Sequence, residues 1–332
     1  MPRSSAIIVS IVIATLLFVV SSGADPLEDY TRLRAWAYSA APIPVPADGV
    51  SWSWDTATWS LASGNLWAQE ATAGDTVTGL VFEGEGRFTM EVPDRVELAQ
   101  LRRFRRDGEL QRLTLPFTKM VVRGSSLATL PLPLTAPAEV AAHALAKERH
   151  EFWLEQYFVD ADARVMWALL NSDAEYLHVD MLTDEDGWVV YEYDSHRLEE
   201  VGVRTWVKRD SVVESWISLD RPEERRPDGR PASDEEWPLD LQHLDATARI
   251  GSMGKRGGYR KTDFSATVRF DVRQDGLRAL RLTLHPLARV DRVIDAGGRE
   301  LSFARDNIGA RSRAFDKRLH DPQLTVFLAE PA

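Results

Sequence analysis

The segment from residue 220 to residue 238, DRPEERRPDGRPASDEEWP, limits the fold of this 332-residue chain more than any other stretch. It is charged, rich in proline and nearly devoid of apolar side chains, so it cannot bury enough surface to offset the entropy of ordering its backbone. The chain must therefore build its cores on either side of this segment. We predict a linker over residues 221–238, an N-terminal β-rich accessory module over residues 25–220 and a second β-domain over residues 239–332.

The N-terminus has the pattern of a secretory signal peptide. A largely apolar run, with no charged residue, extends from Ala6 to Val20, and the small residues Ser22 and Ala24 follow it at the −3 and −1 positions of a cleavage site. This run is short for a membrane span, which favours a cleaved signal over residues 1–24; an N-terminal membrane anchor is the alternative. The chain contains no cysteine, which suggests a bacterial envelope protein, periplasmic or extracellular, with no stable membrane span after cleavage.

The hydrophobic pattern of the residues after this signal predicts a mainly β fold with a few helices (α+β), built as two antiparallel, sandwich-like β-rich domains. Short β-branched and aromatic runs alternate with glycine-containing separators, whose glycines supply the positive φ that tight hairpins need. Apolar residues three or four apart, without internal glycine, predict helices instead. We expect strands near 57–61, 65–70, 77–83 and 86–92, a four-stranded meander between residues 175 and 219, and helices over residues 27–36, 93–106 and 136–158.

One stretch approaches a zinc-peptidase motif. His150 and Glu151 begin the H-E-x-x-H pattern, in which two histidines four residues apart reach one metal ion from one helix face. The second histidine is replaced by Leu154, which cannot bind zinc. We therefore predict no metal ligand, no cofactor-binding residue and no catalytic residue here.

Two other local patterns also favour a structural interpretation. Ser252 and Lys255 match S-x-x-K, but they lie in a glycine-rich basic loop rather than at a helix start. Asp184, Glu185 and Asp186 are adjacent rather than spaced every second residue, so a solvated turn is favoured over a calcium loop.

The net charge of −11 disfavours a nucleic-acid partner, because an acidic surface repels phosphate. The tryptophans leave a different partner open. Indole rings on exported β-modules can stack on sugars, although most tryptophans in strands belong to the core. The densest group, and the candidate for ligand stacking, is Trp52, Trp54, Trp59 and Trp67.

The C-terminal part has a strand order that resembles a known family. Its elements are a strand of the A-T-V-R-F sort, a leucine-rich strand, a V-x-x-V-x-D-x-x-G-x-x-L-x-F hairpin and an L-x-V-x-L-x-x-P strand. They resemble the N-terminal β-domain of membrane alanyl aminopeptidase-type (gluzincin) zinc peptidases. Residues 78–104 resemble an extra module that precedes this domain in exported bacterial relatives. The four elements are Ala266–Phe270, Leu280–Leu284, Val290–Phe303 and Leu324–Pro331.

The resemblance implies a peptidase-like protein without peptidase chemistry. In the family, the catalytic residues lie downstream in a helical domain that carries H-E-x-x-H, and no position of this chain matches them, so no functional residue is carried over. The front domain shapes and caps the substrate cleft. We therefore expect an exported non-catalytic β protein, either truncated or acting alone, with a peptide or polymer ligand. The alternative is an exported module that binds carbohydrate or another envelope polymer through its tryptophans.

Overall fold

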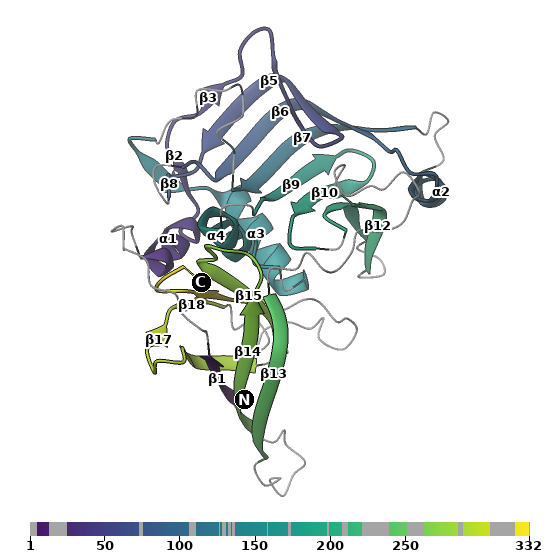
Figure 1. Cartoon of the computed structure of the whole chain (residues 1–332). Coiled ribbons are helices and arrows are strands. Elements are labelled where there is room, and N and C mark those ends of the chain that lie inside the picture. Colours follow the sequence, from purple (N-terminus) through teal and green to yellow (C-terminus); the bar gives the residue numbers. More distant parts are fainter. Residues whose placement is uncertain are drawn as a thin grey trace, which may run out of the picture. The chain divides into compact units, whose positions relative to one another are not determined.

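A computed structural model gives the fold of the chain (Figure 1). It describes residues 5–12, 25–72, 76–105, 111–125, 127, 131, 134, 137–157, 159–171, 174–197, 199–207, 212–220, 239–250, 262–284, 288–305 and 323–331.

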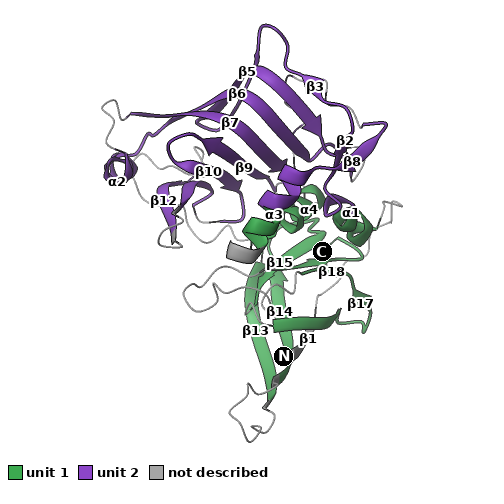
Figure 2. Cartoon of the chain, turned by 180° about the vertical axis from the view of Figure 1, so that it is seen from behind, with its two compact units in different colours: residues 1–31, 150–173, 235–332 green, residues 32–149, 174–234 purple. Residues whose placement is uncertain are grey.

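The chain forms two compact units that interleave along the sequence (Figure 2). The first unit combines the internal segment 150–173 with both ends of the chain. The predicted division into consecutive modules does not include such a grouping. The predicted linker over residues 221–238 lies outside the described residues. Unit 1 comprises residues 1–31, 150–173 and 235–332, and unit 2 comprises residues 32–149 and 174–234.

Unit 2 is built on one large antiparallel sheet, with strand order β12-β11-β10-β9-β7-β6-β5-β3 and β4 paired with β5 (Figure 1). The predicted meander is confirmed as β9, β10, β11 and β12, which follow one another along the chain. Each of these strands pairs with the next in antiparallel fashion. The strands are β3 (Ile43–Pro44), β4 (Val50–Trp54), β5 (Ala57–Ala68), β6 (Gly79–Glu91), β7 (Arg112–Gly124), β9 (Tyr176–Thr183), β10 (Gly187–Asp194), β11 (Val201–Val207) and β12 (Val212–Leu219).

The four short strands predicted between residues 57 and 92 are in fact the two long strands β5 and β6. Of the three separators that indicated hairpin turns, residues 73–75 fall between β5 and β6 and lie outside the described residues. The other two, residues 63–65 and 83–86, are irregular points within these strands, next to places where the pairing register shifts. Gly64 pairs with Gly84 at this point, and both have positive φ, 134° and 158°. A Cβ on Gly84 would lie 2.6 Å from Cα of Gly64, so the glycines allow the strands to approach and bend rather than to reverse.

Strand pairing and a capping side chain determine where two of the helices begin. The helix predicted from residue 136 begins only at Ala144, because Val140–Ala142 (β8) pairs with Ala37–Ser39 (β2) and this pairing overrides the helical propensity of alanine. A helix not predicted from the sequence follows Asp160, whose side chain caps it. The helices are α1 (Pro26–Leu33), α2 (Arg95–Phe104), α3 (Ala144–Tyr157) and α4 (Ala161–Leu170).

Unit 1 contains a five-stranded sheet, order β13-β14-β1-β16-β17, and a three-stranded sheet, order β15-β19-β18. Ser5–Val12 (β1), within the predicted signal peptide, pairs in parallel with both β14 and β16. Cleavage after Ala24 remains a prediction. The other strands are β13 (Leu239–Ile250), β14 (Thr262–Val272), β15 (Ala279–Thr283), β16 (Ala288–Ile294), β17 (Glu300–Leu301), β18 (Phe303–Ala304) and β19 (Gln323–Phe327).

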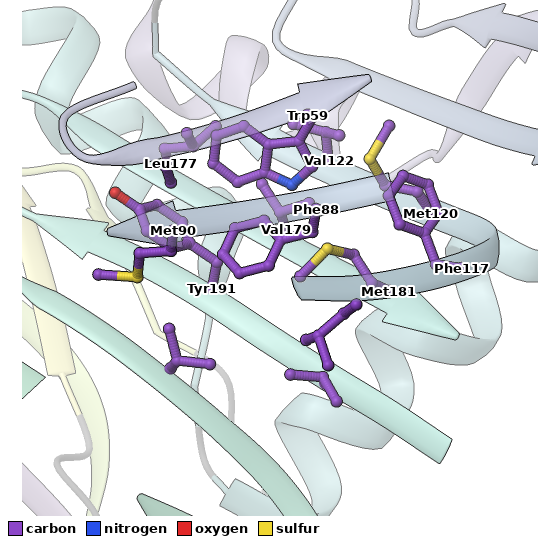
Figure 3. Packing of buried hydrophobic residues seen from close by; sticks show 14 of the residues in the cluster. Trp59, Phe88, Met90, Phe117, Met120, Val122, Leu177, Val179, Met181 and Tyr191 are labelled. Carbon is purple, nitrogen blue, oxygen red and sulfur yellow. The ribbon is translucent and has the colours of Figure 1, made fainter. Parts of the chain in front are cut away.

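Each unit has its own apolar core. In unit 2 the core lies on one face of the large sheet, where Trp59, Phe88 and Tyr191 pack around residues of β7 and β9 (Figure 3). A smaller cluster on the other face joins Val81 and Val121 of the sheet to Ala146 of α3. In unit 1, Leu277, Val293, Leu324 and other residues of the two smaller sheets form a separate core.

Candidate functional site

A row of polar and charged side chains lies on the face of the large sheet that is opposite the main core. Strand alternation places it there, because Leu177, Val179 and Met181 of β9 point into the core and the residues between them point the other way. The pairing register then sets Glu192 of β10 directly opposite His178 of β9. The row consists of Tyr176, His178 and Asp180 on β9, Glu192 and Asp194 on β10, and Arg204 on β11.

His178 lies between two carboxylates. Its Nε2 is 3.6 Å from Oδ2 of Asp180, and its Nδ1 is 3.9 Å from Oε1 of Glu192. The hydroxyl of Tyr176 donates to the same oxygen of Glu192 at 3.2 Å. All four side chains are buried, so these contacts are made away from bulk water, where electrostatic interactions are strongest.

Three arginines neutralise the carboxylates. Arg149 of α3 donates from Nε and Nη2 to the two oxygens of Asp180, at 3.4 and 3.3 Å, and its guanidinium lies 4.1 Å from the ring centroid of Trp188. Arg204 and Arg197 donate to Oε2 of Glu192 at 2.7 and 3.0 Å. We call these eight residues the buried charge network: Tyr176, His178, Asp180, Glu192, Asp194, Arg149, Arg197 and Arg204.

The network shifts the pKa values of two members in opposite directions. Burial alone would lower the pKa of His178, but the neighbouring carboxylates of Asp180 and Glu192 outweigh burial and raise it above 6.5. Burial alone would raise the pKa of Asp180, but the charge of Arg149 and the contact with His178 lower it below 3.8. The network therefore favours the charged form of both groups.

The arrangement is suited to holding charge rather than to turning over a substrate. A histidine beside two carboxylates and a tyrosine could move a proton, but the side chains of His178, Asp180 and Glu192 are each at most 5% exposed. Side chains buried to this degree have almost no contact with the solvent from which a reacting molecule would come. The geometry therefore favours a structural network that fixes β9, β10 and α3 in one arrangement.

The two pKa shifts predict how stability depends on pH. The raised pKa of His178 adds stability that is complete below pH 6.5 and is lost as pH rises through the folded-state value. The lowered pKa of Asp180 adds stability that is complete above pH 3.8 and is lost as pH falls further. We expect urea unfolding to show that His178→Gln flattens the alkaline decline of stability; equal slopes in variant and native protein above pH 6.5 would refute this origin.

The zinc-like motif leads to a second cluster, in unit 1. Nδ1 of His150 lies 3.1 Å from Oδ2 of Asp162, and both side chains are buried. Asp160 completes a group whose ligand atoms lie within 4.8 Å of one another, close enough for a metal ion. Asp160 already accepts hydrogen bonds from the amide of Ala163 at 3.0 Å and from the hydroxyl of Tyr30 at 2.5 Å. Asp160 is thus used as a helix cap and as the acceptor for Tyr30, while His150 and Asp162 contact each other.

The four candidate tryptophans do not form one surface. Trp59 is fully buried, and Trp52 stacks on it with ring centroids 5.6 Å apart. Trp54 packs at the edge of the same core against Tyr193, whereas Trp67 packs with the smaller cluster on the opposite face of the sheet. A stacking role for these residues stays a prediction, and only Trp54 and Trp67 are partly exposed.

The remaining motifs have local explanations or lie outside the described residues. Residues 184–186 form the hairpin between β9 and β10, where the amide of Asp186 donates to Thr183 at 3.1 Å and its carboxylate pairs with Arg105 at 2.5 Å. This supports the turn interpretation over calcium binding. Ser252 and Lys255 lie outside the described residues.

The fold defines a β-rich α+β protein, and the candidate site among its described residues is the buried charge network. Comparison of the chain with protein-family models, with curated proteins and with solved structures finds no match. Within the described ranges, no helix is both long and apolar enough to cross a membrane.

Proposed function

We propose that this chain is an exported, non-catalytic β protein related to the front end of a zinc aminopeptidase, and that it holds or shapes a peptide or polymer ligand. The observation that supports the proposal is that all four elements of the resemblance lie on strands of unit 1. They fall on β14, on β15, on the β16 to β18 segment and on β19.

Two features of the described residues support a role without hydrolysis. Leu154, which stands where the second zinc histidine would be, is buried in α3. His150 of the same helix is engaged by Asp162 rather than displayed in an accessible site. Both observations speak against a zinc-peptidase centre at this motif.

The decisive test uses the purified protein. We expect no turnover of amino-acid anilides and a zinc content far below one ion per chain, measured by mass spectrometry of the metal. Activity that is lost on chelation and restored by zinc would overturn the proposal. Loss of that activity in His150→Gln would then assign the site.

Carbohydrate binding is the second candidate, and the partial exposure of Trp54 and Trp67 is the observation that favours it. Titration of envelope polysaccharides should quench tryptophan fluorescence if these indoles stack on sugars. Trp54→Phe and Trp67→Phe would then reduce the quenching, each separately because the two rings lie on opposite faces of the sheet.

A further inference from the structure

In the hairpin of β13 and β14 in unit 1, residues 239–248 and 264–272 form one apolar face and one polar face. Cross-strand neighbours share a face, so the register between the two strands sorts their side chains. Apolar and polar residues stop alternating between Leu241 and Leu244. A β-bulge between Leu241 and His243 shifts the pairing register there, so Leu244 still lies on the same face as Leu241. The apolar face carries Leu239, Leu241, Leu244, Ala246, Ala248, Phe264, Ala266, Val268, Phe270 and Val272.

Among the described residues, the core of unit 1 covers this apolar face mainly on the β14 side. Val268, Phe270 and Val272 of β14 pack against that core, together with Leu239 at the start of β13. On β13, Leu241 and Leu244, the cross-strand neighbours of Phe270 and Val268, are 56% and 57% exposed, which is unusual for leucines on the apolar face of a sheet.

β13 is also the edge strand of its sheet, as the strand order shows and as Figure 1 illustrates. It is twelve residues long, and its residues from Leu241 to Arg249 are all exposed. A long exposed edge of this kind presents backbone donors and acceptors to another strand, and proteins that remain monomeric normally block such edges.

We infer that β13 is a self-association edge, at which two copies of the chain pair their β13 strands in antiparallel fashion about a two-fold axis at Thr247. The charge pattern selects this register. It sets Asp245 opposite the partner's Arg249, and by symmetry Arg249 opposite the partner's Asp245.

The same register keeps the two apolar faces continuous. Ala246 lies opposite the partner's Ala248, and Leu244 lies opposite the partner's Ile250. Centring the axis on Asp245 would set that carboxylate against its own copy, and centring it on Ala246 or on Ala248 would form no Asp245–Arg249 pair across the seam. Charge therefore favours the Thr247 register over its neighbours.

The test is charge reversal with rescue, read by sedimentation velocity on the full chain over a wide range of protein concentration. We expect a monomer–dimer equilibrium for the native chain. Asp245→Arg alone and Arg249→Asp alone should each weaken the dimer by roughly tenfold or more, because each change places two like-charged pairs across the seam. The double variant Asp245→Arg with Arg249→Asp should restore the dimer.

Asp271→Arg is the matched control, since it reverses an exposed charge on the polar face of β14, away from the edge. It should leave the dimer unchanged. A native chain that is monomeric at every concentration, or a dimer indifferent to the single reversals, would overturn the inference. Circular dichroism identifies any variant that fails to fold. In that case Asp245→Asn replaces the charge reversal: it removes the attraction without adding repulsion, and it should weaken the dimer by a smaller factor.

Discussion

Replacing Arg149 with methionine is expected to lower the free energy of unfolding by about 3–5 kcal/mol, the range found when one partner of a buried ion pair is removed. Asp180 would be left buried without the guanidinium that holds both of its oxygens. The variant also loses the cation–π contact with Trp188. Urea unfolding followed by far-UV circular dichroism measures the loss.

An exposed ion pair on the same sheet provides the control. Lys119 lies 3.3 Å from Glu83, and both side chains are 42% exposed, so Lys119→Met should change stability by less than about 1 kcal/mol. Adding Asp180→Leu to Arg149→Met should recover part of the loss, because the stranded carboxylate is then gone. Equal effects of Arg149→Met and Lys119→Met would contradict the importance of the buried charge network.

Trp59→Ala is expected to cost about 3–5 kcal/mol, because truncation of a large buried aromatic leaves a cavity. Its indole is fully buried and lies against three other rings, with a centroid distance of 5.6 Å to Trp52. The other two rings, Phe88 at 5.2 Å and Tyr191 at 5.0 Å, are labelled in Figure 3. Thermal unfolding should show the loss. The change should also remove near-ultraviolet circular dichroism that arises from the packed rings.

Val96→Ala in α2 serves as the reference substitution, since this valine is 72% exposed and should respond by no more than about 0.5 kcal/mol. If Trp59→Ala were equally mild, the indole would not be a core residue and ligand stacking would regain support.

Periodicity predicted the class of fold well and the lengths of elements poorly. The meander from β9 to β12 was predictable because each strand is bounded by its own turn residues. Between residues 57 and 92 the same residue types mark bends inside strands, and only the partner strand distinguishes a bend from a reversal. The position of β8 was hidden for a similar reason, since its pairing with β2 joins residues about a hundred positions apart.

The buried charge network could not have been found from the sequence. His178 and Asp180 alternate with Leu177 and Val179, which is the pattern of a strand with one face in water. Whether the polar face is solvated or covered depends on α3, which supplies Arg149 from a distant part of the chain. By contrast, α4 could have been predicted from the sequence, because an aspartate before an apolar run of helical composition is a recognisable start signal of a helix.

The contact between Gly64 and Gly84 has a consequence for how freely this chain can vary. A methyl group on either residue would collide with the opposite backbone, at 2.4 Å from the carbonyl oxygen of Glu83 or 2.1 Å from that of Ser63. Neither position can be repaired by moving a flexible side chain, so the two sites constrain each other as a pair. In a library of random substitutions they should tolerate change less than most residues of the apolar core, where neighbouring side chains can shift to make room.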